Sequence, residues 1–221
     1  MDPTNAAQAR RAMVAQIEAL ATASLGHGLD RHVLDAMASV PRHDFVPPRL
    51  RDDAHADRPL PIGCGKTISQ PFIVALMTDL LGLQPAHRVL EIGTGCGYQT
   101  AVLAALAGAV YSVERMPALA DEARQRLAAM GLARVHTRVG DGWLGWPEQA
   151  PFDRIIVTAA PPTLPQALVE QLRPGGRLVL PLGPDGDQQL TVIDKDDAGR
   201  ISRRAMLPVR FSALDPGPGT A

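Results

Sequence analysis

The sequence predicts an α/β fold: a doubly wound, mostly parallel sheet preceded by helices and completed by antiparallel edge strands. Between Val89 and Pro181, short apolar strands rich in β-branched residues alternate with helical segments, which is the pattern of a parallel sheet. Between Gln189 and Phe211, two strand patterns instead flank a polar hairpin, which indicates antiparallel pairing. The 221 residues are enough for one such domain with its own core.

The N-terminal part is predicted to be helical. In order, the predicted segments are a helix over residues 6–20, a helix over 31–39, an irregular segment over 42–57, a loop over 60–71 and a helix over 71–81. Asp30 is a typical N-cap, and Pro41 follows the second helix closely. Pro71 suits the first position of the third helix, and Gly82 suits its end.

The second part is predicted to form the sheet. Its strands are predicted at residues 88–92, 110–113, 135–139, 154–158 and 177–181, its helices at 98–107, 117–130 and 164–172, and its edge strands at 189–194 and 206–211. Pro174, Gly175 and Gly176 are predicted to turn the chain into the fifth strand. We expect one domain over 1–214, with a helical and loop part over 1–85, a sheet over 86–214, and a disordered tail over 215–221.

Composition excludes several classes of function. The net charge of −1 and the aromatic content of 4% do not suit a nucleic-acid surface. Cys64 and Cys96 are isolated, and the six histidines show no metal-binding spacing. Residues 1–10 lack the apolar core expected of a signal peptide, and no apolar run reaches the length of a membrane span. We therefore expect a cytoplasmic monomer with no metal, membrane or nucleic-acid partner.

A glycine-rich turn joins the first strand of the sheet to its helix, with the sequence Glu91-Ile92-Gly93-Thr94-Gly95-Cys96-Gly97. Glycines let the backbone turn sharply and approach a ligand closely. Their spacing at every second position differs from the G-x-G-x-x-G of dinucleotide sites. An acid such as Glu91 can instead face the cationic methionyl end of S-adenosylmethionine. The alternative is a tight turn without a ligand.

Two further acids follow the next strands. Glu114 ends the second strand and can accept hydrogen bonds from ribose hydroxyls, or be a solvated charge. Asp141, with Gly142 beside it, can accept a bond from an adenine amino group, or form an ordinary turn. This order resembles the class I S-adenosylmethionine-dependent methyltransferases and their Rossmann-like fold. The resemblance implies a cofactor site made of Glu91, Gly93, Thr94, Gly95, Gly97, Glu114, Asp141, Gly142 and Thr158, without metal, and S-adenosylhomocysteine as product.

Residues after the fourth strand and residues before the sheet both limit the class of substrate. After the fourth strand, Thr158-Ala159-Ala160-Pro161-Pro162 lacks the Asn/Asp-Pro-Pro-aromatic motif of enzymes that methylate base amino groups. The segments Val40-Pro41-Arg42-His43 and Leu60-Pro61-Ile62-Gly63, followed by Thr67-Ile68-Ser69-Gln70-Pro71, resemble those of the protein-L-isoaspartate O-methyltransferases. The resemblance extends to about Phe211. It implies methylation of the free α-carboxylate of L-isoaspartyl or D-aspartyl residues in damaged proteins, which starts repair through a succinimide.

This resemblance implies that Ser69 orients the substrate carboxylate, together with Thr67, Ile68 and Gln70. A carboxylate is already ionised at neutral pH, so it needs placement and not a general base. Alternatively, Ser69 is only the N-cap of the following helix. Cys64 and Lys66 stand where the family commonly has His and Gln, and we expect Lys66 to be solvated.

Three other functions compete with this one. The first is methylation of a dedicated biosynthetic peptide or small-molecule carboxylate. The second is a cofactor-binding scaffold without catalysis, against which the intact Thr67-Ile68-Ser69 segment counts. The third, a nicotinamide oxidoreductase, is disfavoured by the glycine spacing.

Overall fold

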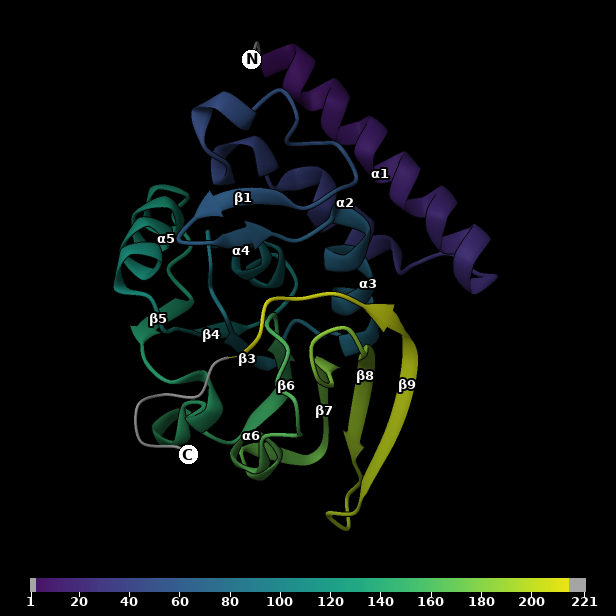
Figure 1. Ribbon diagram of the computed structural model, residues 1–221, viewed down its shortest axis with the longest axis vertical. Coiled ribbons are helices and arrows are strands. Elements are labelled where there is room, and N and C mark those ends of the chain that lie inside the picture. Colours follow the sequence, from purple (N-terminus) through teal and green to yellow (C-terminus); the bar gives the residue numbers. More distant parts are fainter. Residues whose placement is uncertain (1–2, 215–221) are drawn as a thin grey trace.

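The computed structural model describes residues 3–214 and has one central sheet of seven strands, in the order β5-β4-β3-β6-β7-β8-β9 (Figure 1). The strands of this sheet are β3 (Arg88–Ile92), β4 (Ala109–Glu114), β5 (Val135–Val139), β6 (Phe152–Val157), β7 (Leu172–Leu182), β8 (Gln188–Lys195) and β9 (Ile201–Val209). Strands β3 to β7 pair in parallel, whereas β8 and β9 pair antiparallel. The predicted fold class is confirmed.

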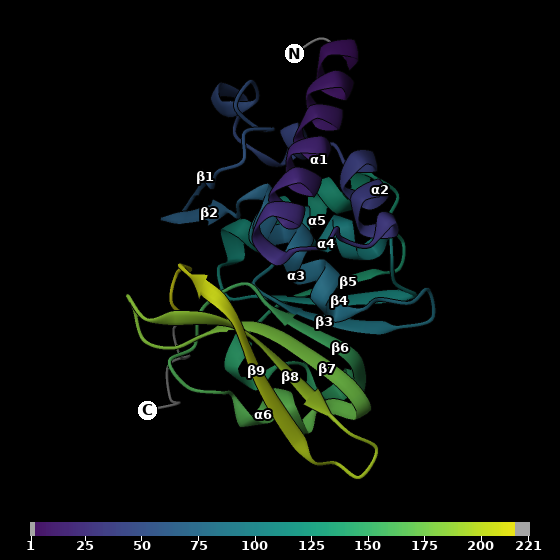
Figure 2. The same ribbon diagram turned by 90° about the vertical axis from the view of Figure 1, so that its right-hand side faces the viewer.

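Helices cover both faces of the sheet. They are α1 (Pro3–Leu25), α2 (Arg31–Ser39), α3 (Pro71–Leu81), α4 (Tyr98–Ala104), α5 (Pro117–Ala129) and α6 (Gln166–Glu170), with short 3-10 helices η1 (Arg42–Phe45), η2 (Pro48–Leu50), η3 (Gly142–Leu144) and η4 (Pro147–Gln149). Figure 2 shows α1 to α5 on one side of the sheet and α6 on the other. Among residues 3–214, no helix combines the length and apolarity that a membrane crossing needs.

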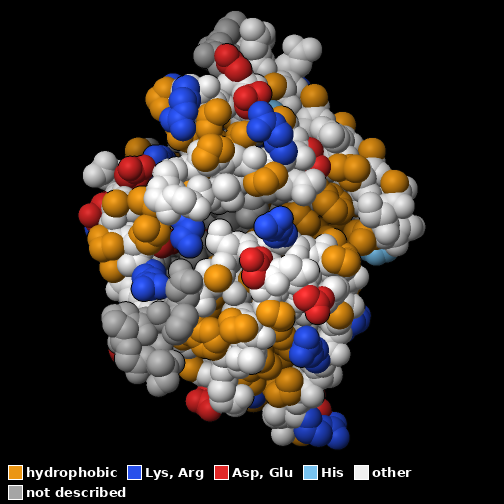
Figure 3. Space-filling model, viewed as in Figure 1, with side chains coloured by type: hydrophobic (Ala, Val, Ile, Leu, Met, Phe, Trp, Pro, Cys, Tyr) orange, Lys and Arg blue, Asp and Glu red, His pale blue; other side chains and the backbone are white. Residues whose placement is uncertain are grey.

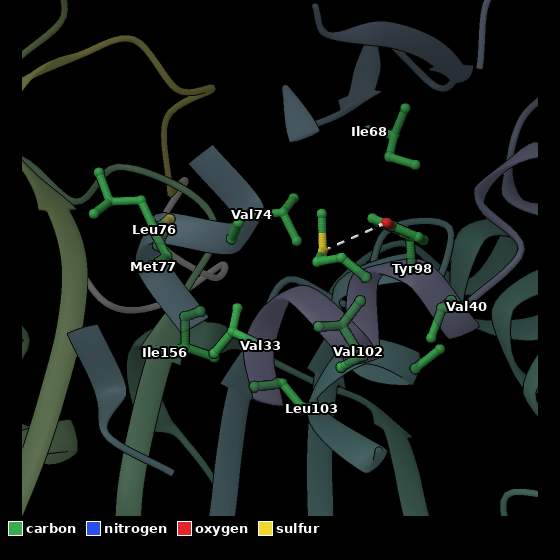
Figure 4. Packing of buried hydrophobic residues seen from close by; sticks show 14 of the residues in the cluster. Val33, Val40, Ile68, Val74, Leu76, Met77, Tyr98, Val102, Leu103 and Ile156 are labelled. Carbon is green, nitrogen blue, oxygen red and sulfur yellow. Dashed lines mark hydrogen bonds between the residues drawn. The ribbon is translucent and has the colours of Figure 1, made fainter. Parts of the chain in front are cut away.

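Alternation along the strands divides the core into two layers. In β3, Val89 belongs to the layer under α1 to α5, whereas Leu90 belongs to the layer on the α6 side. Figure 4 shows the first layer, in which α2, α3 and α4 pack against β6. There the Tyr98 hydroxyl donates to the Met37 sulfur at 3.6 Å. This layer joins the N-terminal helices to the sheet, because it contains side chains of both.

The bounds of helices α2 and α3 agree with the local signals in the sequence. Helix α2 spans the predicted residues, and the Asp30 side chain accepts from the amide of His32 as its N-cap. Helix α3 begins at Pro71 and ends before Gly82, whose φ of 58° lies in the left-handed region. These boundaries depend on capping residues that lie next to the helix in sequence, so the sequence alone predicts them.

The segment over residues 60–71 was predicted to be a loop, and this prediction is wrong. It contains a two-stranded antiparallel sheet of β1 (Leu60–Gly63) and β2 (Lys66–Ile68). The chain reverses through Gly63, Cys64 and Gly65, whose φ angles are 101°, 51° and 69°. Cys64 is the single non-glycine residue with positive φ among the described residues. The hairpin lies over the end of the sheet at which β3, β4 and β6 finish (Figure 1).

The fifth strand also differs from its prediction. Strand β7 begins at Leu172, because residues 174–176 form a bulge within it and not a turn before it. The pairing of β6 with β7 shifts there, from Phe152 opposite Leu172 to Arg154 opposite Arg177. Helix α6 is correspondingly shorter than predicted, and α4 ends at Ala104. The predicted disordered tail over 215–221 lies outside the described residues.

Candidate active site

A cleft of about 1320 Å³ opens between the β1–β2 hairpin and the carboxyl ends of the parallel strands. Its walls come from the end of α1, parts of residues 57–77, the glycine-rich turn, the connection from β4 to α5, Gly142, Thr158 with Ala159, and residues 207–214. Figure 3 shows the hollow, with Lys and Arg side chains on both sides of it. Such a crevice at the carboxyl ends of strands is where open α/β sheets bind ligands.

The glycine-rich turn follows β3 and forms part of the cleft wall. Gly93, Thr94 and Gly95 line the cleft, and the φ of Gly93 is 93°. A Cβ atom on Gly93 would lie 2.3 Å from the hydroxyl oxygen of Thr158, so a side chain does not fit there. The Thr158 hydroxyl donates to the Gly93 carbonyl at 2.7 Å. This contact joins the turn to the end of β6.

Glu114 lies at the end of β4 and lines the cleft, although the residue is only 7% exposed. One carboxylate oxygen accepts from the amide of Gly95 at 2.9 Å, and the other accepts from the amide of Met116 at 2.9 Å. Each oxygen keeps acceptor capacity, since a carboxylate oxygen has two lone pairs. The group therefore fixes the turn and can still accept bonds from a diol.

Glu91 does not line the cleft, which corrects the prediction that its carboxylate faces the ligand. It is fully buried on the α4 side of β3, where one oxygen accepts from the hydroxyls of Thr100 at 2.5 Å and Ser112 at 2.6 Å. The Ser112 hydroxyl lies 2.6 Å from that of Thr94, which does line the cleft. Glu91 is thus connected to the cleft through two hydroxyl groups.

The burial of Glu91 predicts a pH-dependent stability. Burial raises its pKa to about 7, against the hydrogen bonds from Ser112 and Thr100, which lower it. Between pH 4.5, its ordinary pKa, and 7, the unfolded chain releases this proton first, so stability falls as the pH rises. The Glu91→Gln variant lacks this proton. The difference in free energy of unfolding between variant and wild type should therefore shift in favour of the variant by up to about 3 kcal/mol between pH 4 and a pH above 7. Urea unfolding of both proteins between pH 4 and 9 measures this, and a pH-independent difference would contradict it.

Two other predicted cofactor residues lie outside the cleft wall. Gly97 precedes α4, and a Cβ atom there would lie 3.4 Å from side-chain atoms of Ala123 and Leu127 in α5. Asp141 is the N-cap of η3, and its side chain accepts from the amide of Trp143 at 2.9 Å. Its neighbour Gly142 does line the cleft. Gly97 thus serves helix packing, and Asp141 holds the backbone beside Gly142.

The predicted substrate residues Thr67, Ile68, Ser69 and Gln70 all line the cleft opposite the glycine-rich turn. Ser69 is not the N-cap of α3, because Gln70 occupies that position. Among residues 3–214, the Ser69 hydroxyl has no hydrogen-bond partner, whereas its carbonyl accepts from Arg42. The backbone of Ser69 is therefore held while its hydroxyl stays available to a ligand.

Two residues that hold this segment were not predicted from the sequence. Arg42 donates from Nη2 to the Ser69 carbonyl at 2.7 Å. The Asp57 carboxylate accepts from the Gln70 side chain at 2.7 Å and from the Phe72 amide at 2.8 Å. Asp57 thus satisfies a free amide of the first turn of α3 from a distance in sequence. Neither residue shows a local signal for these contacts, which join segments far apart in the chain.

We expect Asp57→Ala to lower the free energy of unfolding by about 1–2 kcal/mol, as loss of a helix cap does. The matched control is Asp53→Ala, because Asp53 lies in the same segment and pairs with Arg58 at the surface. Exposed ion pairs contribute little, so this control should change stability by less than about 0.5 kcal/mol. Urea unfolding measures both, and equal losses would show that Asp57 does not cap α3.

Lys66 lies in the cleft wall, half-buried, and has no ion-pair partner among residues 3–214. Cys64 is exposed, Cys96 is buried, and both are free thiols. In the described part of the chain, no group of three or more His, Cys, Asp or Glu side chains could hold a metal ion.

The family described as "Protein-L-isoaspartate(D-aspartate) O-methyltransferase (PCMT)" matches residues 15–217. A protein-L-isoaspartate O-methyltransferase of Anaeromyxobacter dehalogenans is 59% identical, over 86% of this chain and 93% of its own. The protein-L-isoaspartate O-methyltransferase 1 of a Polaromonas species is 54% identical, over 93% of this chain and 89% of its own.

Two solved structures resemble the whole fold. One, a protein-L-isoaspartate O-methyltransferase, is 28% identical with a TM-score of 0.81; the match covers 92% of this chain and 65% of that longer chain. The other is a Plasmodium falciparum protein described as a putative enzyme of the same name, in complex with S-adenosyl-L-homocysteine. It is 23% identical with a TM-score of 0.80, over 93% of this chain and 98% of its own.

Proposed function

Because this chain belongs to the protein-L-isoaspartate(D-aspartate) O-methyltransferase family, we infer that its cleft brings S-adenosylmethionine together with an isoaspartyl residue of a damaged protein. The protein is a methyltransferase that esterifies the free α-carboxylate of such residues. The observation that supports the assignment of its site is the cleft itself. The glycine-rich turn and the segment with Thr67, Ile68 and Ser69 face the same hollow.

The residues at the glycine-rich turn fit the cofactor. We assign its binding to the backbone of Gly93 and Gly95, to Thr94, to Gly142 and Thr158, and to Glu114. The close approach of Thr158 leaves no room for a side chain at Gly93, so only backbone lines the cleft at that residue. The free lone pairs of Glu114 suit the two hydroxyls of a ribose. S-adenosylmethionine supplies the methyl group, which passes to a carboxylate oxygen as the carbon–sulfur bond breaks.

On the substrate side, Ser69 is assigned to orient the carboxylate, together with Thr67, Ile68 and Gln70. The free hydroxyl of Ser69 can donate to one carboxylate oxygen and leave the other free to react. The carboxylate is ionised at neutral pH, so the chain needs no base to activate it. The contribution of the protein is placement in a confined cleft. We also propose that the enzyme acts as a monomer and does not use nucleic acid as a substrate.

Labelled methyl transfer to a synthetic isoaspartyl peptide, compared with its aspartyl twin, tests the proposed function. We expect label in the isoaspartyl peptide only, as a base-labile ester. Equal labelling of the two peptides, or none, would contradict the proposal. A dedicated small-molecule carboxylate is not favoured, because the named relatives that cover most of this chain are protein-L-isoaspartate O-methyltransferases.

A further inference from the structure

Arg42 is a fully buried cation whose hydrogen bonds go to backbone carbonyls. Its side chain is 0% exposed, and among residues 3–214 no carboxylate forms an ion pair with it. Nε donates to the carbonyl of Ala54 at 2.8 Å, and Nη2 donates to the carbonyl of Ser69 at 2.7 Å. Burying a cation without a carboxylate is costly. The bonds to Ala54 and Ser69 tie two segments of the substrate part to one rigid group.

The same guanidinium also contacts the cofactor side of the cleft. Its central carbon lies 4.8 Å from the centre of the Tyr98 ring, a cation–π contact. Tyr98 is the first residue of α4 and directly follows the glycine-rich turn. Tyr98 is itself fixed, since it is 1% exposed and its hydroxyl donates to the sulfur of Met37. Arg42 therefore connects the end of the glycine-rich turn to the carbonyl of Ser69.

The segment that begins at Ser69 is held at both ends. Arg42 fixes the Ser69 carbonyl, and Asp57 fixes the Phe72 amide and the Gln70 side chain. These contacts restrain the backbone and leave the Ser69 hydroxyl without a partner among the described residues. The position of that hydroxyl relative to the glycine-rich turn thus depends on groups outside the reacting centre.

We propose that Arg42 is a positioning residue, which sets the place of Ser69 relative to the cofactor turn. The inference rests on the proposed role of Ser69. A guanidinium suits this task because it is planar, stacks on an aromatic ring and donates in several fixed directions. A lysine keeps the charge but cannot reproduce two separate bonds and a stacked face. The contribution of Arg42 to catalysis therefore passes through Ser69.

A double-mutant cycle tests this. Arg42→Lys is made in the wild type and in the Ser69→Ala background, and kcat and KM for an isoaspartyl peptide are measured. In the wild type, Arg42→Lys should lower kcat about 10-fold or more, since small misplacements near a reacting group are costly. In the Ser69→Ala background the further loss should be less than about twofold, because the residues act as one unit. The Kd for S-adenosylhomocysteine should stay close to the wild-type value in every variant.

Arg154→Lys is the matched control for a structural role. Arg154 is a partly buried arginine that also donates to backbone carbonyls, those of Leu81, Asp153 and Gly175, and it does not line the cleft. The Arg154→Lys variant should lose stability as Arg42→Lys does, but its kcat should be unchanged. If Arg42→Lys does not fold, Arg42→Gln replaces it in the double-mutant cycle, because this variant removes the buried charge and keeps an amide donor.

Equal losses of kcat in the two backgrounds would overturn the proposal, as would a similar loss in Arg154→Lys. Failure of both Arg42 variants to fold would also overturn it, since Arg42 would then be a folding determinant. Different results would refute the role of Ser69 and the proposed activity. If Ser69→Ala alone keeps full kcat, the role of Ser69 is wrong, whereas absence of transfer to isoaspartyl peptide by the wild type refutes the activity.

Discussion

Ser69→Ala should lower kcat for an isoaspartyl peptide by about 100-fold, because placement of a reacting group has effects of this size. Ser69 lines the cleft and its hydroxyl has no partner among residues 3–214, so removal of the hydroxyl leaves the protein's own hydrogen bonds intact. The carbonyl of Ser69 still accepts from Arg42. The Kd for S-adenosylhomocysteine and the melting temperature should therefore stay at wild-type values. Steady-state kinetics, calorimetry and thermal unfolding measure the three quantities.

Ser39→Ala is the control for this change. Its hydroxyl donates to the carbonyl of Ala36 within α2, away from the cleft. The control should keep wild-type kcat, with at most a small loss of stability. An undiminished kcat in Ser69→Ala would mean that the backbone of residues 67–69 holds the carboxylate without the hydroxyl. A loss of both kcat and cofactor affinity would mean that Ser69 supports the whole cleft.

Glu114→Ala should have the largest effect on cofactor binding. Hydrogen bonds to charged groups contribute about 1.5–3 kcal/mol, so the Kd for S-adenosylhomocysteine should rise about 10- to 150-fold. The structure adds a second reason. The carboxylate also accepts from the amides of Gly95 and Met116, so its loss releases the glycine-rich turn that forms the wall of the cleft. Isothermal titration calorimetry measures the change.

Glu122→Ala is the matched control, since Glu122 lies in the adjacent helix α5 and pairs with Arg126 near the surface. It should leave the Kd within about twofold, as expected for an exposed ion pair. Melting temperatures of both variants separate a weakened site from an unfolded one. A Glu114→Ala protein that is folded and binds with wild-type affinity would remove Glu114 from the cofactor site.

Much of the fold could be predicted because its signals are local or periodic. The apolar strands between residues 88 and 157 appear at or near their predicted positions, and Asp30 and Gly82 bound their helices as expected. The glycine-rich turn could be recognised from its spacing alone. Parallel strands then bring the segments after them to one edge, so the predicted Glu114, Gly142 and Thr158 share a cleft wall.

The features that were not predicted depend on contacts between distant residues, which no local sequence pattern shows. The β1–β2 hairpin was missed because its glycines and prolines also suit a loop. Glu91 was expected to face the cofactor, whereas Leu90 and Ile92 on either side of it belong to the α6 layer and place it on the opposite, buried face of β3. The hydrogen bonds of Arg42 and Asp57 join residues 12 to 27 positions apart, and no periodicity predicts them.

The cleft wall formed by residues 207–214 has a consequence for biosynthesis. Backbone bonds between Ala160 and the segment at Ser212 and Leu214 hold this stretch across the site. Leu20 and Ser24, near the other end of the described chain, line the same hollow. Residues 207–214 therefore have to leave the ribosome before the site can close, and a nascent fragment that ends before residue 207 has the glycine-rich turn without a complete substrate cleft. Activity should therefore appear only in nascent chains that extend past residue 214 and have released it from the ribosome.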